Sequence, residues 1–343
     1  MNWGFAAGLF IAVFAATFVA TKVVLASLHR QSLLDLPNER SSHTVPTPRG
    51  GGLAMLLVIV PTVLLLSMYD FISFEQAAFV GGLTILLGVV SWIDDVRGLG
   101  PLIRLGAHFL SVSTALYLGL VDGPVFGGLL PPVLDAVASA FVWVWFINLF
   151  NFMDGIDGIA GVETLSIGIG VALLAGVVGV TRIDSGFAYF GITIAAAAAG
   201  FLIWNWHPAK VFMGDVGSVP LGFMLGWMLL SLAAEGYLAA ALIMPSYFLF
   251  DASVTLLRRL LQGQKAWEAH REHFYQQAVQ SGKSHAEVSR AVLVVNIALI
   301  GLAVLTTTGY IWGPLVVALC IVVALVMYMR KPKHVSMSDG DTE

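Results

Sequence analysis

The chain alternates between long apolar runs and short polar or glycine-rich segments along its whole length. The runs have about the 17–25 residues that an α-helix needs to cross a bilayer. They predict about eleven spans, approximate to a few residues: 3–27, 51–69, 76–93, 103–120, 133–150, 162–180, 187–204, 217–234, 237–257, 289–307 and 309–329. The predicted fold is an all-α polytopic membrane protein with one transmembrane domain, 1–330, and a disordered tail, 331–343.

Consecutive spans divide the intervening segments between the two sides of the membrane. The tail lies on the same side as the predicted loops 28–50, 94–102, 151–161, 205–216 and 258–288. Of the 17 Lys and Arg residues, all but Arg182 belong to this set or to the helix ends that face it. Because cytoplasmic loops carry the excess of basic residues, we expect these loops and the C-terminus to be cytoplasmic and the N-terminus to be outside.

Composition agrees with this pattern. The chain is 58% hydrophobic and 11% charged, whereas a soluble domain carries about a quarter charged residues. The net charge of −4 gives no indication of a nucleic-acid partner. The only cysteine, Cys320, cannot form an internal disulfide.

Three of the predicted cytoplasmic loops carry aspartates beside glycines. Asp94 and Asp95 end the third span, Asn151–Gly158 reads Asn-Phe-Met-Asp-Gly-Ile-Asp-Gly, and Phe212–Ser218 reads Phe-Met-Gly-Asp-Val-Gly-Ser. A carboxylate at the end of an apolar run is costly unless it has a partner. Carboxylates near glycine-rich loops suit a hard divalent cation that holds phosphate groups. We therefore expect a site for Mg²⁺, with Mn²⁺ as the alternative.

Each motif also has a simpler interpretation. The adjacent pair Asp94 and Asp95 could be a solvated helix end. Asp154 and Asp157 could belong to a turn, because Asn, Asp and Gly favour turns, although their three-residue spacing places them on roughly one helix face. Asp215 could be a helix N-cap and nothing more.

Basic residues accompany the aspartates on the same side. The first loop contains His43 and Arg49, and the last contains His270, Arg271 and His273. Arginine and histidine close to a phosphate dianion would neutralise its charge, so we expect these residues to bind substrate. The alternative for the last loop is a solvated helix face.

In their order along nearly the whole chain, these motifs resemble those of the polyprenyl-phosphate N-acetylhexosamine-1-phosphate transferases, glycosyltransferase family 4. The resemblance implies that Asp94, Asp95 and Asp215 are catalytic and bind the metal. The alternative for Asp94 and Asp95 is that one of them takes a proton from the lipid phosphate. It implies that Asn151, Asp154, Asp157, Asn205 and Phe212 bind the nucleotide, with the Phe212 ring stacking on uracil. His270, Arg271 and His273 replace a histidine-rich phosphate motif.

Two features indicate a branch of that family. The segment from Ala269 to Gln276 resembles the branch that initiates O-antigen, and Gly98 stands where the peptidoglycan branch carries a lysine. The resemblance implies a Mg²⁺-dependent transfer of N-acetylhexosamine 1-phosphate from a UDP-sugar to undecaprenyl phosphate, with release of UMP. It also implies a bacterial inner-membrane location, an active site that faces the cytoplasm, and a homodimer. A peptidoglycan-branch enzyme that uses UDP-MurNAc-pentapeptide is the alternative.

The competing class of function is a secondary transporter. Transporters have broken helices and charged groups near the middle of the bilayer. In this chain the predicted sites lie at the cytoplasmic helix ends, and only Asp251 is deeper within a predicted span. The pattern therefore favours an enzyme.

Overall fold

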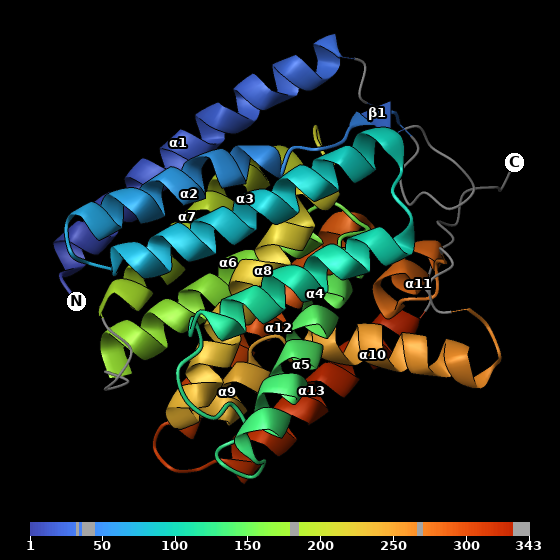
Figure 1. Ribbon diagram of the computed structural model, residues 1–343. Helices are drawn as coiled ribbons and strands as arrows, with labels where there is room; N and C mark the ends of the chain where they lie inside the picture. The colour runs from blue at the N-terminus through green and yellow to red at the C-terminus, as the bar shows by residue number, and fades with distance from the viewer. Residues whose placement is uncertain (32–33, 36–44, 179–184, 266–269, 332–343) are drawn as a thin grey trace, which may run out of the picture.

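The computed structural model describes residues 1–31, 34–35, 45–178, 185–265 and 270–331 (Figure 1). The predicted tail therefore lies outside the described residues except for Lys331, and His43 also lies outside them. The elements are α1 (Trp3–Arg30), β1 (Leu34–Asp35), β2 (Thr47–Pro48), α2 (Leu53–Met68), α3 (Phe74–Arg97), α4 (Pro101–Tyr117), α5 (Pro132–Phe152), α6 (Ile159–Leu173), η1 (Leu174–Val178), α7 (Ser185–Asn205), α8 (Asp215–Leu232), η2 (Ala233–Tyr237), α9 (Leu238–Ile243), α10 (Ser246–Leu261), α11 (Phe274–Gln280), α12 (His285–Thr306) and α13 (Trp312–Arg330). The two short strands pair antiparallel.

The helices form a bundle in which α6, α7 and α8 are innermost (Figure 1). The apolar span that contains α8 is 94% buried, whereas the one in α1 is only 22% buried. A helix that is apolar all round is buried in a core or faces lipid. The inner helices therefore form the core, and the exposed apolar faces of α1, α12 and α13 suit lipid.

The structure confirms an all-α polytopic membrane protein. Among the described residues, eight helices are long and apolar enough to cross a membrane. The helices α2 and α10 have 16 residues each and α4 has 17, which is shorter than the roughly 20 residues of a full span. The count of eleven and the orientation remain predictions.

The predicted ninth span, 237–257, is wrong as one continuous helix. Gly236 has a φ of 92°, and α9 ends after six residues at Ile243. Pro245 then precedes α10, and a proline cannot donate the backbone hydrogen bond that would continue a helix. This break gives α10 a direction of its own in the bundle (Figure 1).

Two of the predicted cytoplasmic loops come together through backbone contacts. The amide of Phe212 donates to the carbonyl of Pro48 at 2.8 Å, and Gly51 donates to the carbonyl of Phe212 at 2.8 Å. Gly52 touches Gly217, so that a Cβ on Gly52 would lie 2.3 Å from the Gly217 Cα. Glycine at both positions therefore lets the first loop pack directly against the start of α8.

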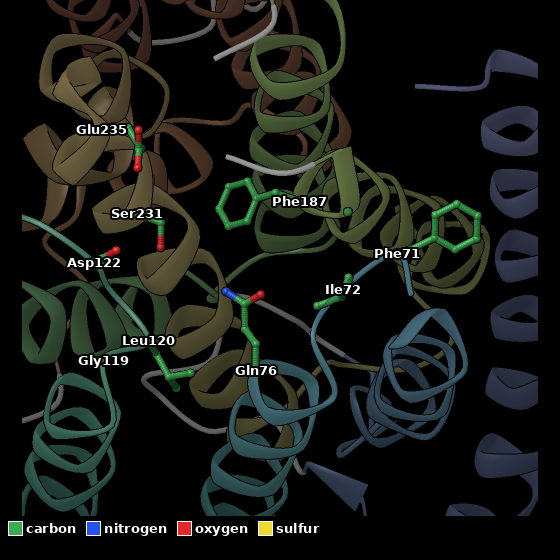
Figure 2. Close-up of a pocket in the computed structure, with 10 residues that line it drawn as sticks. Phe71, Ile72, Gln76, Gly119, Leu120, Asp122, Phe187, Ser231 and Glu235 are labelled. Carbon is green, nitrogen blue, oxygen red and sulfur yellow. The ribbon is translucent and has the colours of Figure 1, made fainter. Parts of the chain in front are cut away.

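A separate cavity of about 210 Å³ lies at the other end of α3 and α8 (Figure 2). Its lining includes Gln76, Asp122, Phe187, Ser231 and Glu235. Among the described residues, neither Asp122 nor Glu235 forms a salt bridge. The cavity is therefore distinct from the aspartate loops, which lie at the opposite helix ends.

Candidate active site

Three aspartates and two arginines form one ion-pair network. Asp94 and Asp95 lie in the last turn of α3, and Asp215 begins α8. Arg49 Nη2 lies 3.1 Å from Asp95 Oδ1 and 2.6 Å from Asp215 Oδ1. Arg104 Nη1 lies 3.0 Å from Asp94 Oδ2 and 3.5 Å from Asp215 Oδ2. The structure thus brings together the three aspartates predicted to be catalytic and the predicted Arg49.

Backbone groups fix the carboxylates of this network. Leu99 N donates to Asp94 Oδ1 at 2.6 Å, and Val216 N donates to Asp95 Oδ2 at 3.2 Å. Gly214, with a φ of 74°, precedes Asp215, and a Cβ there would lie 2.9 Å from a backbone nitrogen of the first loop. The next two N–H groups of α8, those of Gly217 and Ser218, donate to the carbonyl of Gly214 at 2.9 and 3.0 Å. The end of α3 is therefore held against the start of α8.

Asp154 adds a fourth carboxylate. Among the described residues, none donates a hydrogen bond to its side chain. Burial, and then the negative charges of Asp215 and Asp95, raise the pKa of Asp154 well above its ordinary value, and Arg49 opposes them. A divalent cation in the cluster would favour the ionised form of Asp154. The four carboxylates would then exceed the two guanidinium groups by two negative charges, which matches the charge of such a cation.

The loop that carries Asp154 is tied to its neighbours on both sides. Ser218 Oγ donates to Asn151 Oδ1 at 2.8 Å. Tyr275 Oη donates to the carbonyl of Phe152 at 2.9 Å, and a Cβ on Gly155 would lie 2.1 Å from that same Oη. The predicted nucleotide loop therefore packs against α8 and against the last loop.

Asp157 faces two imidazole rings. Its Oδ2 lies 2.6 Å from His207 Nδ1 and its Oδ1 lies 3.1 Å from His285 Nδ1, while Ala209 N donates to Oδ2 at 3.1 Å. Burial disfavours the charged carboxylate, but the two imidazoles and the amide bring the pKa of Asp157 below its ordinary value. The three side chains could hold a metal ion, but hydrogen bonding already explains their arrangement.

Asn205 and Phe212 differ in how far their side chains are available to a ligand. Asn205 is 3% exposed, its Oδ1 accepts from Gly158 N at 3.0 Å, and its Nδ2 donates to the carbonyl of Val211 at 2.9 Å. Both ends of this amide therefore connect loops of the site. The hydrogen bonds of Phe212 described above involve its backbone, and its side chain is half-buried.

The predicted substrate-binding residues of the last loop differ in how deeply they are buried. His273 is buried, with Nδ1 3.1 Å from Asp251 Oδ1, whereas His270 and Arg271 are half-buried. Burial, and then the charges of His273 and Arg259, lower the pKa of His270 to about 4. With no phosphate bound, the His270 side chain is therefore mostly neutral near pH 7, and its role in binding substrate stays a prediction. The guanidinium of Arg271, by contrast, keeps its positive charge at any ordinary pH.

Two residues of the site were missed by the sequence analysis. Arg104 is the only Lys, Arg, Asp or Glu in the run 103–120, and a lone charge one turn inside an apolar helix is a usable functional signal. His285 sits among polar residues at the start of α12, where nothing in the sequence distinguishes it. Its contact with Asp157 depends entirely on how α12 packs.

Comparison with known proteins adds independent information. The sequence model described as glycosyl transferase family 4 matches residues 77–233. A decaprenyl-phosphate N-acetylglucosaminephosphotransferase of Mycolicibacterium smegmatis is 30% identical over 351 residues, covering 91% of this chain and 84% of the relative. A probable undecaprenyl-phosphate N-acetylglucosaminyl 1-phosphate transferase of Bacillus subtilis is 26% identical, covering 94% and 89%. A phospho-N-acetylmuramoyl-pentapeptide-transferase of Streptococcus pyogenes is 30% identical, covering 62% and 66%. The matched stretch 77–233 contains all four carboxylates of the cluster.

Proposed function

The chain belongs to glycosyl transferase family 4, and on this basis we propose that it transfers N-acetylhexosamine 1-phosphate from a UDP-sugar to undecaprenyl phosphate. The coarser activity, a membrane-bound sugar-phosphate transferase that uses a polyprenyl phosphate, follows from the relatives. The observation that carries the proposal is the network of three aspartates and two arginines at one end of the helix bundle.

The reaction is one displacement at phosphorus. An oxygen of the lipid phosphate attacks the β-phosphorus of the UDP-sugar, and the bond from that phosphorus to the oxygen of the α-phosphate breaks. UMP leaves with the electron pair, and the products are the lipid diphosphate sugar and UMP. The second pKa of a phosphomonoester is about 6, so the attacking phosphate is mostly dianionic near neutrality. A strong general base is not required, and Asp94 and Asp95 act mainly by position.

The excess negative charge of the acidic cluster supports a divalent cation. Asp215, Asp94 and Asp95 would hold Mg²⁺, which supplies charge neutralisation at the diphosphate when bound. Arg49 and Arg104 hold the carboxylates in place and present guanidinium N–H groups suited to phosphate oxygens. Phosphoryl transfer depends largely on such positioning and electrostatic stabilisation.

The remaining loops suit the nucleotide and the sugar diphosphate. Phe212 offers a ring for stacking on uracil, Asn151 and Asp157 shape the adjoining loops, and Arg271 supplies a positive charge for phosphate. The segment from His270 supports the branch that initiates a cell-surface glycan such as O-antigen. We place the site on the cytoplasmic face of the bacterial inner membrane, in a protein that forms a homodimer.

The test is release of UMP by the purified full-length protein. The protein is incubated with Mg²⁺, undecaprenyl phosphate and, one at a time, UDP-GlcNAc, 6-deoxy UDP-N-acetylhexosamines and UDP-MurNAc-pentapeptide. We expect UMP with at least one N-acetylhexosamine donor, and its loss when EDTA replaces Mg²⁺. Turnover with UDP-MurNAc-pentapeptide alone would assign the chain to the peptidoglycan reaction. Absence of UMP with every donor would refute the proposal.

A further inference from the structure

Asp251 of α10 is a fully buried carboxylate that lies outside the acidic cluster. It is 0% exposed, and its two oxygens receive five hydrogen-bond contacts. Those to Oδ1 come from His273 Nδ1 at 3.1 Å, Phe274 N at 3.0 Å and Thr255 Oγ1 at 3.3 Å, and those to Oδ2 come from Tyr247 Oη at 2.9 Å and Tyr275 N at 3.2 Å. Burial of a carboxylate is costly unless its hydrogen-bonding capacity is satisfied, and here it is satisfied mainly by the last loop.

These contacts fix the start of α11. The first N–H groups of a helix have no partner within the helix, and Asp251 supplies one from another helix to Phe274 and Tyr275. A second connection between the same elements is the ion pair of Arg259 with Glu272. The segment that begins with His270 and Arg271 is therefore attached to α10 at two consecutive residues, Glu272 and His273.

The same short helix also contacts the acidic cluster. Tyr275, whose amide Asp251 holds, donates from its Oη to the carbonyl of Phe152 at 2.9 Å. That carbonyl belongs to the residue two positions before Asp154. The Tyr275 ring also lies so close to Gly155 that a Cβ at this position would not fit. A continuous set of contacts thus runs from Asp251 through Tyr275 to the loop that carries Asp154.

We propose that Asp251 is a positioning residue that holds Arg271 and Asp154 in place for the diphosphate of the nucleotide sugar. This inference rests on the proposed function. Asp251 is enclosed by protein groups and has no exposed surface for a substrate to contact, so it acts through the start of α11. Replacement of Asp251 by asparagine would remove the charge and leave one amide oxygen for donors that now share two carboxylate oxygens.

A matched control lies at the other end of the bundle. Asp135 of α5 is 5% exposed and likewise accepts two backbone amides, Val125 N at 3.0 Å and Phe126 N at 3.0 Å. Asp135→Asn therefore removes the same kind of buried backbone cap without altering the acidic cluster. Any effect that reflects only a lost structural hydrogen bond should be common to both variants.

The experiment compares steady-state kinetics and thermal unfolding of the wild-type protein with those of Asp251→Asn and Asp135→Asn. We expect both variants to unfold at lower temperatures. Only Asp251→Asn should raise the KM for the UDP-sugar, by about tenfold or more, with the KM for undecaprenyl phosphate changed less than twofold. Tyr275→Phe removes only the bond to Phe152 and should raise the donor KM in the same direction by about threefold; it keeps the test possible if Asp251→Asn does not fold.

A wild-type donor KM in Asp251→Asn, or equal kinetic losses in the Asp251 and Asp135 variants, would overturn the inference. If Asp251→Asn does not fold, an unchanged donor KM in Tyr275→Phe would overturn it. These outcomes are distinguishable from failure of the proposed function, in which the wild-type protein itself shows no turnover.

Discussion

Replacing Asp215 by asparagine removes one charge from the centre of the acidic cluster and keeps the size of the side chain. Asp215 is 8% exposed and contacts both guanidinium groups. At an effective dielectric constant of about 20, two unit charges about 4 Å apart interact by about 4 kcal/mol. This corresponds to about three powers of ten in rate. Because both arginine side chains are more than one third exposed, solvent screens part of this interaction, and we expect kcat to fall roughly 10²- to 10³-fold.

The assay measures UMP release over a range of Mg²⁺ concentrations, with folding monitored by thermal unfolding and size-exclusion chromatography. The Mg²⁺ concentration for half-maximal activity should rise in Asp215→Asn, because one of the proposed ligands has lost its charge. The control is Asp122→Asn, an exposed aspartate at the other end of the bundle, which should retain wild-type kinetics. A folded Asp215→Asn protein with a kcat within threefold of wild type would refute the assignment of this residue.

Three further variants test other parts of the site. Arg104→Met removes a guanidinium that contacts two of the carboxylates and should lower kcat/KM at least tenfold. Arg104→Lys keeps the positive charge and should retain part of the lost activity. Equal activity of the wild type and Arg104→Met would contradict a role for this guanidinium. The pKa of His270 is about 4 rather than the ordinary 6.5, so the imidazole binds a proton less readily in the folded state than in the unfolded chain. The stability of the folded state therefore falls as pH decreases from about 6.5 towards 4. His270→Gln should therefore reduce the loss of thermal stability between pH 7 and pH 5. An unchanged pH dependence would contradict the assigned pKa. Gly155→Ala should lower activity because its Cβ would lie 2.1 Å from Tyr275 Oη, and adding Tyr275→Phe should restore part of it; no recovery would show that the clash is not the cause.

Much of the architecture can be read from the pattern of apolar runs. Each predicted span overlaps a helix, because a segment in lipid must satisfy its backbone hydrogen bonds internally. The alternation of the predicted spans placed the aspartate loops on one side, and the structure brings Asp94, Asp95 and Asp215 together. The cytoplasmic orientation, which rests on the basic residues, remains a prediction. The break between α9 and α10 was missed because the apolar run is continuous across Pro245. Its position depends on the local backbone at Gly236 and Pro245 rather than on hydrophobicity.

The contacts of individual polar residues were harder to predict. Asp251 looked like a carboxylate within a span, with no indication that its partners would be the backbone of residues 274 and 275, more than 20 positions later. The neutral state of His270 follows from burial against His273 and Arg259, which the spacing of the motif does not reveal. These features depend on contacts between residues that are far apart in the chain, and the local sequence around each residue does not reveal such contacts.

The central claim is that the transferred group includes the β-phosphate of the donor. The most direct measurement uses a UDP-N-acetylhexosamine labelled with ³²P in the β-position, undecaprenyl phosphate and the purified protein, followed by separation of lipid and nucleotide products. Transfer of the sugar 1-phosphate predicts that the label enters the lipid and that unlabelled UMP is released in equal amount. Label recovered in UDP, with sugar alone on the lipid, would contradict the account.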